Sequence, residues 1–108
     1  MALARAIQGA KRPSQSITWT REDDSNTPED LTGATITARI RRQGQGTSED
    51  VTGAFTVIDG DGGEFRWDYS DDDVDIAGEH RVQFTATFND TPTPAKTFIA
   101  EWIVEESL

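Results

Sequence analysis

The sequence predicts an all-β protein built as an antiparallel sandwich of six to seven strands, and three observations carry this prediction. Apolar and polar side chains alternate along several short segments, as they do in strands with one buried face. Stretches rich in glycine, proline and aspartate separate these segments at the spacing typical of sandwiches. The central body shows no helical periodicity. At 108 residues and without cysteine, the chain fits one domain that can bury a core without disulfides.

The N-terminal segment differs from the rest in charge. Residues 1–14 form a basic N-terminal arm with three basic groups and no acid, and residues 15–108 form the sandwich domain. We expect the arm to be a short helix up to Gly9 or to lack fixed structure, and Pro13 ends either arrangement.

The first two expected strands follow the arm. Residues 16–20 alternate with Ile17 and Trp19 inward, and residues 21–30 are too polar to contribute to a core. Residues 34–42 form the second strand, whose inward side chains are Ala34, Ile36, Ala38 and Ile40.

The middle of the chain predicts a hairpin. Residues 51–58 resume a strand after a loop, with an irregularity at Gly53. The Asp-Gly-Asp-Gly-Gly run at residues 59–63 supplies the positive φ angles that hairpin turns require. The next strand turns Phe65, Trp67 and Tyr69 inward.

An acidic run at residues 71–75 leads into the longest alternating segment. After Gly78, the side chains of His80, Val82, Phe84, Ala86 and Phe88 share one face. This pattern is typical of the corner that feeds a long strand in immunoglobulin-like sandwiches, where a tyrosine commonly points inward. Here the inward residue is His80, so we assign Gly78 and His80 to a structural corner in which the imidazole needs a hydrogen-bond partner.

The closing strand, residues 96–105, follows a loop at residues 89–95. Phe98, Ala100, Trp102 and Val104 share its inward face, yet Ile99 and Ile103 lie on the opposite one. We therefore expect Ile99 and Ile103 to be an interaction surface, covered by the N-terminal arm, by a second copy or by another protein. The predicted core is Ile17, Trp19, Ile36, Ile40, Phe65, Trp67, Val82, Phe84, Phe98 and Trp102.

The net charge argues against a nucleic-acid partner, and the lack of long apolar segments argues against a membrane partner. The net charge is −10, and the body without the arm carries −13, so phosphate backbones should be repelled and we expect no nucleic-acid partner. No segment approaches the roughly 20 apolar residues of a membrane helix. Arg5 and Gln8 interrupt the apolar centre that a secretory signal needs, so we expect neither a membrane partner nor export.

Chemistry-bearing residues form no catalytic pattern. His80 has no Ser or Cys partner in a recognisable motif, and paired aspartates in a solvated loop lack the cleft that acid–base catalysis needs. The basic residues Arg39, Arg41, Arg42 and Arg66 could form a stripe on an outer sheet face that pairs with nearby acids. We predict no catalytic, metal or cofactor site, and we interpret as turn residues the possible calcium ligands Asp59, Asp61, Glu64, Asp71, Asp72, Asp73 and Asp75.

Three segments carry a family resemblance. Leu-Thr-Gly-Ala at residues 31–34, Gly-Glu-Phe-Arg-Trp-Asp-Tyr at residues 63–69 and the run at residues 73–88 occur in this order. Together they resemble the N-terminal immunoglobulin-like domain of phage baseplate upper proteins and related small tailed-phage structural proteins. The resemblance covers residues 15–106, although His80 stands where the family has tyrosine.

The resemblance implies a non-enzymatic structural component of a phage or prophage particle, in its tail, baseplate or neck. Such a component would act by protein–protein docking to virion proteins or to copies of itself, as a homo-oligomer, and would be assembled in the host cytoplasm and located in the virion. The alternative is a bacterial immunoglobulin-like binding module of the adhesin or carbohydrate-binding type. That class often exposes an aromatic platform, whereas here Trp67 and Trp102 are expected to point inward.

Overall fold

The structure, a computed structural model, describes residues 3–21, 24–88, 91–96 and 99–108. The prediction of an all-β protein is confirmed, because these residues form strands and no helix. None of them therefore belongs to a helix that could cross a membrane. The strands are β1 (Ala6–Ile7), β2 (Gln15–Thr18), β3 (Thr20–Arg21), β4 (Asp24–Pro28), β5 (Ala34–Arg41), β6 (Glu49–Asp50), β7 (Ala54–Asp59), β8 (Glu64–Asp68), β9 (Gly78–Phe88), β10 (Thr91–Lys96) and β11 (Ala100–Glu105).

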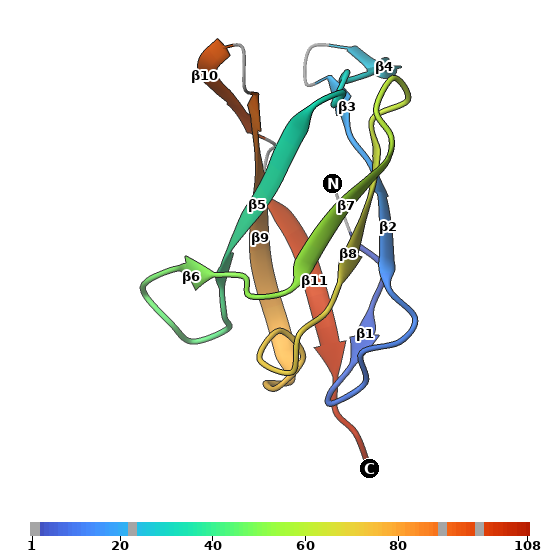
Figure 1. Cartoon of the computed structure of the whole chain (residues 1–108). Coiled ribbons are helices and arrows are strands. Elements are labelled where there is room, and N and C mark those ends of the chain that lie inside the picture. Colours follow the sequence, from blue (N-terminus) through green and yellow to red (C-terminus); the bar gives the residue numbers. More distant parts are fainter. Residues whose placement is uncertain (1–2, 22–23, 89–90, 97–98) are drawn as a thin grey trace.

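Two sheets pack face to face, as the sandwich prediction requires (Figure 1). The large sheet has the order β1-β11-β9-β5-β6, and β10 also pairs with β9. The second sheet has the order β2-β8-β7, and β3 and β4 form a separate small hairpin. All pairings in the two sheets are antiparallel except that between β1 and β11, which is parallel.

The core lies between the two sheets and follows the predicted alternation. Every residue of the predicted core that the structure describes is buried, and Phe98 lies outside the described residues. Strict alternation produces this result because neighbouring side chains of a strand point to opposite faces of its sheet. Leu31 and Val74, which lie in loops rather than strands, are also fully buried.

Aromatic rings from both sheets meet at the centre of the core. The ring of Trp67 on β8 lies 4.6 Å from that of Trp102 on β11 and 6.1 Å from that of Phe84 on β9. The Phe65 and Phe84 rings contact each other edge to face at 5.3 Å. Large aromatic side chains bury much area per residue, so a chain with few apolar residues still fills the space between two sheets.

Two segments that lie outside the predicted strands pair as strands in the structure. β10 occupies residues 91–96, and its backbone pairs with β9 with a register shift between Thr91 and Ala95. Prolines are tolerated in such an irregular strand, which lies beyond the end of β11 at the edge of the sheet. The polar segment at residues 21–30 contributes to the β3–β4 hairpin. In both segments the backbone supplies the pairing, which side-chain polarity does not reveal.

The N-terminal segment is built into the large sheet. We expected a short helix or no fixed structure, but Ala6 pairs with Val104 and the backbone N–H of Leu3 donates to the Glu101 carbonyl at 3.0 Å. The side-chain amide of Gln15 also exchanges hydrogen bonds with the backbone of Ala4, at 2.8 and 3.1 Å. Pairing of β1 gives β11 a neighbour along what would otherwise be an open edge.

Candidate docking face and supporting corner

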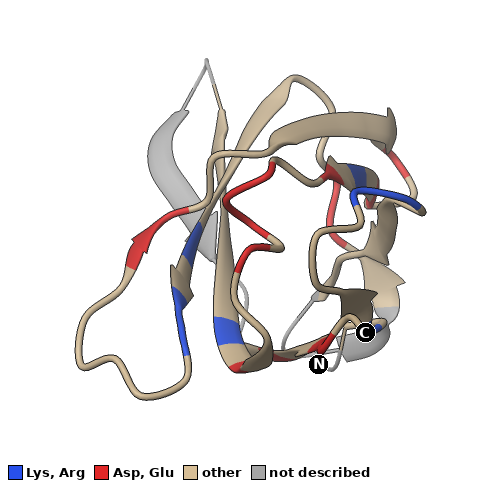
Figure 2. Cartoon of the chain, turned by 90° about the horizontal axis from the view of Figure 1, so that it is seen from below, with Lys and Arg blue, Asp and Glu red and all other residues tan. Residues whose placement is uncertain are grey.

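The outer face of the large sheet comprises the side chains of β5, β9 and β11 that point away from the second sheet, together with Ile99. On β11 it presents Glu101, Ile103 and Glu105, between the buried Ala100, Trp102 and Val104. Figure 2 shows basic positions on the neighbouring strands β5 and β9, and acidic positions on β6. With Glu101 and Glu105 of β11, charges of both signs and aliphatic groups therefore share this face.

The two isoleucines assigned to an interaction surface lie on the outer face. Ile99 is 52% exposed, and Ile103 is half-buried opposite Glu79 of β9. The described part of the arm, residues 3–14, does not cover them, because β1 pairs with β11 edge to edge. Instead it adds Ile7, which is 52% exposed and pairs with Glu105 on the same side. Sequence reasoning missed Ile7 because a two-residue strand has no visible alternation.

The expected stripe of arginines divides between different surfaces. Arg42 is buried, and its guanidinium bonds to Glu49 at 2.8 Å and to the carbonyl of Asp72. Arg66 lies on the second sheet and pairs with Asp68 at 3.1 Å. The idea of a single outer stripe is therefore wrong for these two residues, although both pair with acids as expected.

Arg39 and Arg41, the other two members of the expected stripe, lie with Arg81 where β5 and β9 are side by side. Arg39 pairs with Asp50 at 2.7 Å and bonds to Ser48. Arg41 lies directly opposite Arg81 in the strand register. Within the described part of the chain, neither Arg41 nor Arg81 has an acidic group within 4.0 Å. Arg81 was not singled out from the sequence, because only the strand register brings it beside Arg41.

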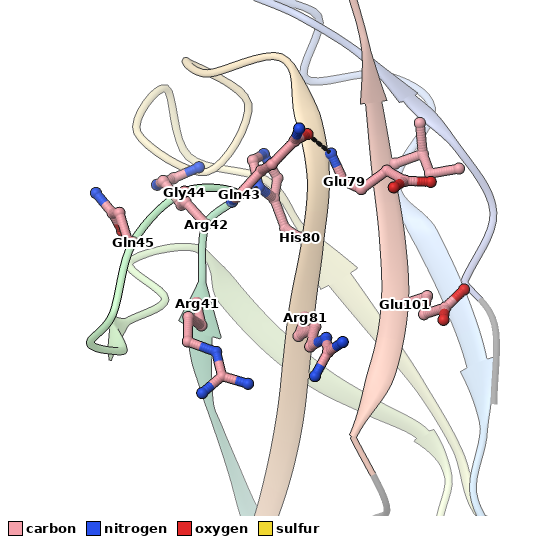
Figure 3. Close-up of a pocket in the computed structure, with 10 residues that line it drawn as sticks. Arg41, Arg42, Gln43, Gly44, Gln45, Glu79, His80, Arg81 and Glu101 are labelled. Carbon is pink, nitrogen blue, oxygen red and sulfur yellow. Dashed lines mark hydrogen bonds between the residues drawn. The ribbon is translucent and has the colours of Figure 1, made fainter.

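Two adjoining hollows share Arg41 and Arg81. The first, of about 320 Å³, also includes Gln45, Glu79, Glu101 and Ile103 in its lining (Figure 3). The second, also about 320 Å³, is called here the arginine groove. Its complete lining is Arg39, Arg41, Gly46, Ser48, Arg81, Gln83 and Ile99, and none of these residues is acidic.

His80 lies just after the corner and is fully buried. Its Nδ1 accepts a hydrogen bond from the backbone N–H of Gln43 at 3.1 Å, so the ring proton is on Nε2, which donates to the Ile76 carbonyl at 2.8 Å. Burial lowers the pKa of His80, and the nearby Arg42 charge acts in the same direction. The imidazole is therefore neutral near pH 7, and both ring nitrogens are occupied.

Gly78 occupies a conformation that suits glycine. Its φ is +144°, and a Cβ atom there would lie 2.7 Å from Oε1 of Gln43. That oxygen already accepts a hydrogen bond from the backbone N–H of Glu79 at 2.8 Å. The Gln43 side chain and backbone together thus tie the end of β5 to the start of β9.

Asp73 shows that the acidic run is not uniformly solvated. Its carboxylate is buried and accepts hydrogen bonds from the indole N–H of Trp67 at 3.0 Å and from the backbone N–H groups of Ser70 and Thr52 at 3.0 and 3.2 Å. Our interpretation of this residue as a solvated turn residue was wrong. Asp71, by contrast, is exposed and pairs with Lys11 at 3.2 Å.

The other acidic positions form local contacts. Asp59 accepts a hydrogen bond from the backbone N–H of Gly62 at 3.1 Å, within the turn between β7 and β8. In the described residues, no group of three or more acidic, histidine or cysteine side chains is close enough together to hold a metal ion.

Comparison with known proteins is informative at the level of fold. No family model matches the sequence, and no curated protein matches it. The architecture defines a class, the small all-β sandwich domain. Among solved structures of this class, the N-terminal domain of phage TP901-1 ORF48 is similar, with a TM-score of 0.60 and 18% identity. The match covers 96% of this chain and 85% of that one, so the two share a fold along nearly their whole length.

Proposed function

We propose that the chain is a non-enzymatic structural component of a tailed-phage particle that acts by protein–protein docking. The observation that carries the proposal is the fold shared with a phage domain over 96% of the chain. The resemblance of residues 15–106 to phage baseplate upper proteins, which depends on short sequence segments rather than on architecture, points in the same direction. The partners would be other virion proteins or further copies, and the protein would reside in the virion after assembly in the host cytoplasm.

We also infer that the sandwich is immunoglobulin-like. Two features support this assignment: the large sheet has consecutive β11, β9 and β5, and a corner precedes β9. In immunoglobulin-like domains the corner tyrosine bonds to the backbone a few residues upstream. Here His80 makes the equivalent bond to Ile76, and Gly78 permits the turn between them. We propose a structural role for both residues.

The proposed docking surface is the part of the outer face around Ile99 and Ile103. Ile99 is half exposed, and Ile7 of β1 adds a second exposed aliphatic side chain on the same face. Contact with a partner would remove this apolar surface from water, which favours association. A partner can contact the outward residues of β11 without disturbing the core, because these residues alternate with the buried ones.

The alternative, an adhesin or carbohydrate-binding module, has less support. Such modules commonly stack sugars on exposed aromatic rings. All three tryptophans of this chain and its single tyrosine are buried. A platform would then have to be built from phenylalanine alone.

Particle association tests the proposal directly. In the phage or lysogen that encodes the chain, we expect the tagged protein to co-sediment with purified particles and to be detected in them by mass spectrometry. Recovery from the cell envelope, with none in particles, would contradict the proposal and favour the alternative.

The docking surface has its own test. Replacing both Ile99→Lys and Ile103→Lys should strongly reduce incorporation while the isolated domain stays folded. The matched control is Thr35→Lys with Thr37→Lys, two exposed outer positions of β5, which should incorporate normally. Equal incorporation of both double variants would place the contact elsewhere.

A further inference from the structure

We propose that the arginine groove binds a carboxylate-bearing segment of a partner protein, with Arg41 and Arg81 holding one acidic side chain and Ile99 contacting an apolar neighbour of that side chain. This inference rests on the proposed docking function and names the chemistry of the partner. It concerns the junction of β5 and β9, beside the isoleucine surface of β11.

The Arg41–Arg81 pair brings two like charges together, and Glu101 of β11, which lies opposite Arg81 on its other side, forms no ion pair with it within 4.0 Å. The two residues are directly opposite in the antiparallel register, where like charges destabilise a pair of strands. Arg39, Arg42 and Arg66 each have an acidic partner within 3.1 Å, whereas no such pair exists for Arg41 or Arg81 in the described part of the chain. A carboxylate between two guanidinium groups would neutralise the repulsion and accept several charge-assisted hydrogen bonds.

The surroundings direct that carboxylate to one side of the pair. Figure 3 shows the Arg41 and Arg81 side chains on neighbouring strands, both directed away from the loop that carries Gln43. Glu79 and Glu101 line the hollow on the other side, where they would repel an incoming acid. The arginine groove contains no acid in its lining, and Arg39 is held at its wall by Asp50 and Ser48.

Charge and shape favour a protein segment over a polyanion. The chain carries a net charge of −10, and Glu79 and Glu101 lie on the other side of the arginine pair, so a continuous phosphate backbone that extends beyond the groove would meet repulsion there. Two guanidinium groups can pair with one or two carboxylates but not with a long series of phosphates. Ile99, which is 52% exposed at the groove, offers an apolar contact that a protein side chain can use.

The inference can be tested with the purified full chain and defined probes. The first probe is a short peptide with an Asp-Phe-Asp centre in Gly/Ser flanks, and its twin carries Asn-Phe-Asn. We expect the acidic peptide to shift the NMR signals of the Arg41 and Arg81 side chains and of the Ile99 methyl groups. The twin should bind about ten-fold more weakly, because it cannot form charge-assisted bonds. Raising the salt concentration should weaken the binding of the acidic peptide but not that of its twin, because salt screens charge interactions.

Matched variants separate the groove from general charge. Arg41→Gln with Arg81→Gln should abolish the difference between the two peptides. Lys11→Gln with Arg12→Gln changes the net charge equally but lies outside the groove, and it should leave binding unchanged. Circular dichroism and thermal melting confirm that each variant is folded.

Each of the following binding results would overturn the inference: equal binding of the two peptides, no shift at millimolar peptide, shifts confined to other residues, or tighter binding of a single-stranded oligonucleotide than of the acidic peptide. Self-association that is lost in the Arg41/Arg81 variant would make a second copy the occupant, which contradicts a separate partner. Because these measurements need no particles, a failure of the groove inference can be distinguished from a failure of the proposed function. If no peptide bound in the groove, the proposal of particle incorporation would be unaffected. If the protein were absent from particles, measured binding in the groove would still hold.

Discussion

The two sides of strand β9 carry opposite properties. Its inner side presents His80, Val82, Phe84 and Ala86, all fully buried against the second sheet or the corner. Its outer side presents polar groups, among them Glu79, Arg81 and Gln83, on the outer face of the large sheet. One strand thus stabilises the fold with alternate residues and leaves the others available for contacts. Changes on the inner side should therefore alter stability, and changes on the outer side should alter association.

The largest expected effect comes from the inner side. Phe84→Ala removes a fully buried ring that packs at 5.3 Å from Phe65, and truncation of a buried aromatic costs about 3–5 kcal/mol. Domains of this size have only about 5–15 kcal/mol in total. Urea unfolding should therefore show a greatly lowered midpoint. An unchanged midpoint would mean that this face does not carry the stability of the fold.

The buried carboxylate extends the comparison to the acidic loop. Asp73→Ala leaves the Trp67 indole N–H and two backbone N–H groups without their acceptor, which should cost at least about 2 kcal/mol. The control is Asp71→Ala two residues away, an exposed ion-pair member that should cost less than about 1 kcal/mol. Equal losses from the two variants in chemical denaturation would contradict the division between buried and solvated aspartates.

Histidine at the corner predicts a dependence on pH. Because burial lowers the pKa of His80 below 6.5, the unfolded chain binds more protons than the folded one when the pH falls below about 6.5. The stabilisation is fully present above pH 6.5 and is lost progressively toward the lower folded-state pKa. The melting temperature should therefore fall between pH 7 and pH 5.5.

The matched variant for this prediction is His80→Gln. A glutamine can bond to the Gln43 N–H and to the Ile76 carbonyl without titrating. The melting temperature of this variant should therefore fall less between pH 7 and pH 5.5 than that of the unchanged chain. If the melting temperatures of both proteins fell equally over this pH range, a group other than His80 would be responsible for the pH dependence.

Outer substitutions should have small effects on folding. Ile99→Lys with Ile103→Lys leaves the buried residues of β11 in place, so the unfolding free energy should change by less than about 1 kcal/mol. Thermal melting of the isolated domain measures this change. Unfolding of the double variant would show that these isoleucines belong to the core rather than to a docking face.

The smallest expected effect concerns calcium. If the acidic turns act only as turn residues, millimolar calcium should not raise the melting temperature relative to magnesium, because a ligand selective for the folded state would raise it. A rise of several degrees with calcium alone would identify a site among the aspartates of residues 59–75.

Regular alternation explains why so much of the fold could be predicted. The inward positions of β5, β8 and β9 follow from a period of two, so Ile40, Trp67 and Phe84 were assigned to the core correctly. The β1 pairing escaped prediction because two residues show no period. β10 escaped because its pairing depends on backbone geometry beside β9, not on the character of its side chains.

Some features of the candidate site also follow from local alternation, and others depend on tertiary packing. Alternation along the chain is enough to place Ile99 and Ile103 opposite the buried side chains Ala100, Trp102 and Val104. The tertiary structure, by contrast, sets the burial of Asp73 and the exposure of Asp71, because the two differ in what packs against them and not in chemistry. It likewise decided that Arg41 faces Arg81: strand register joins residues far apart in the chain, and no local pattern encodes it.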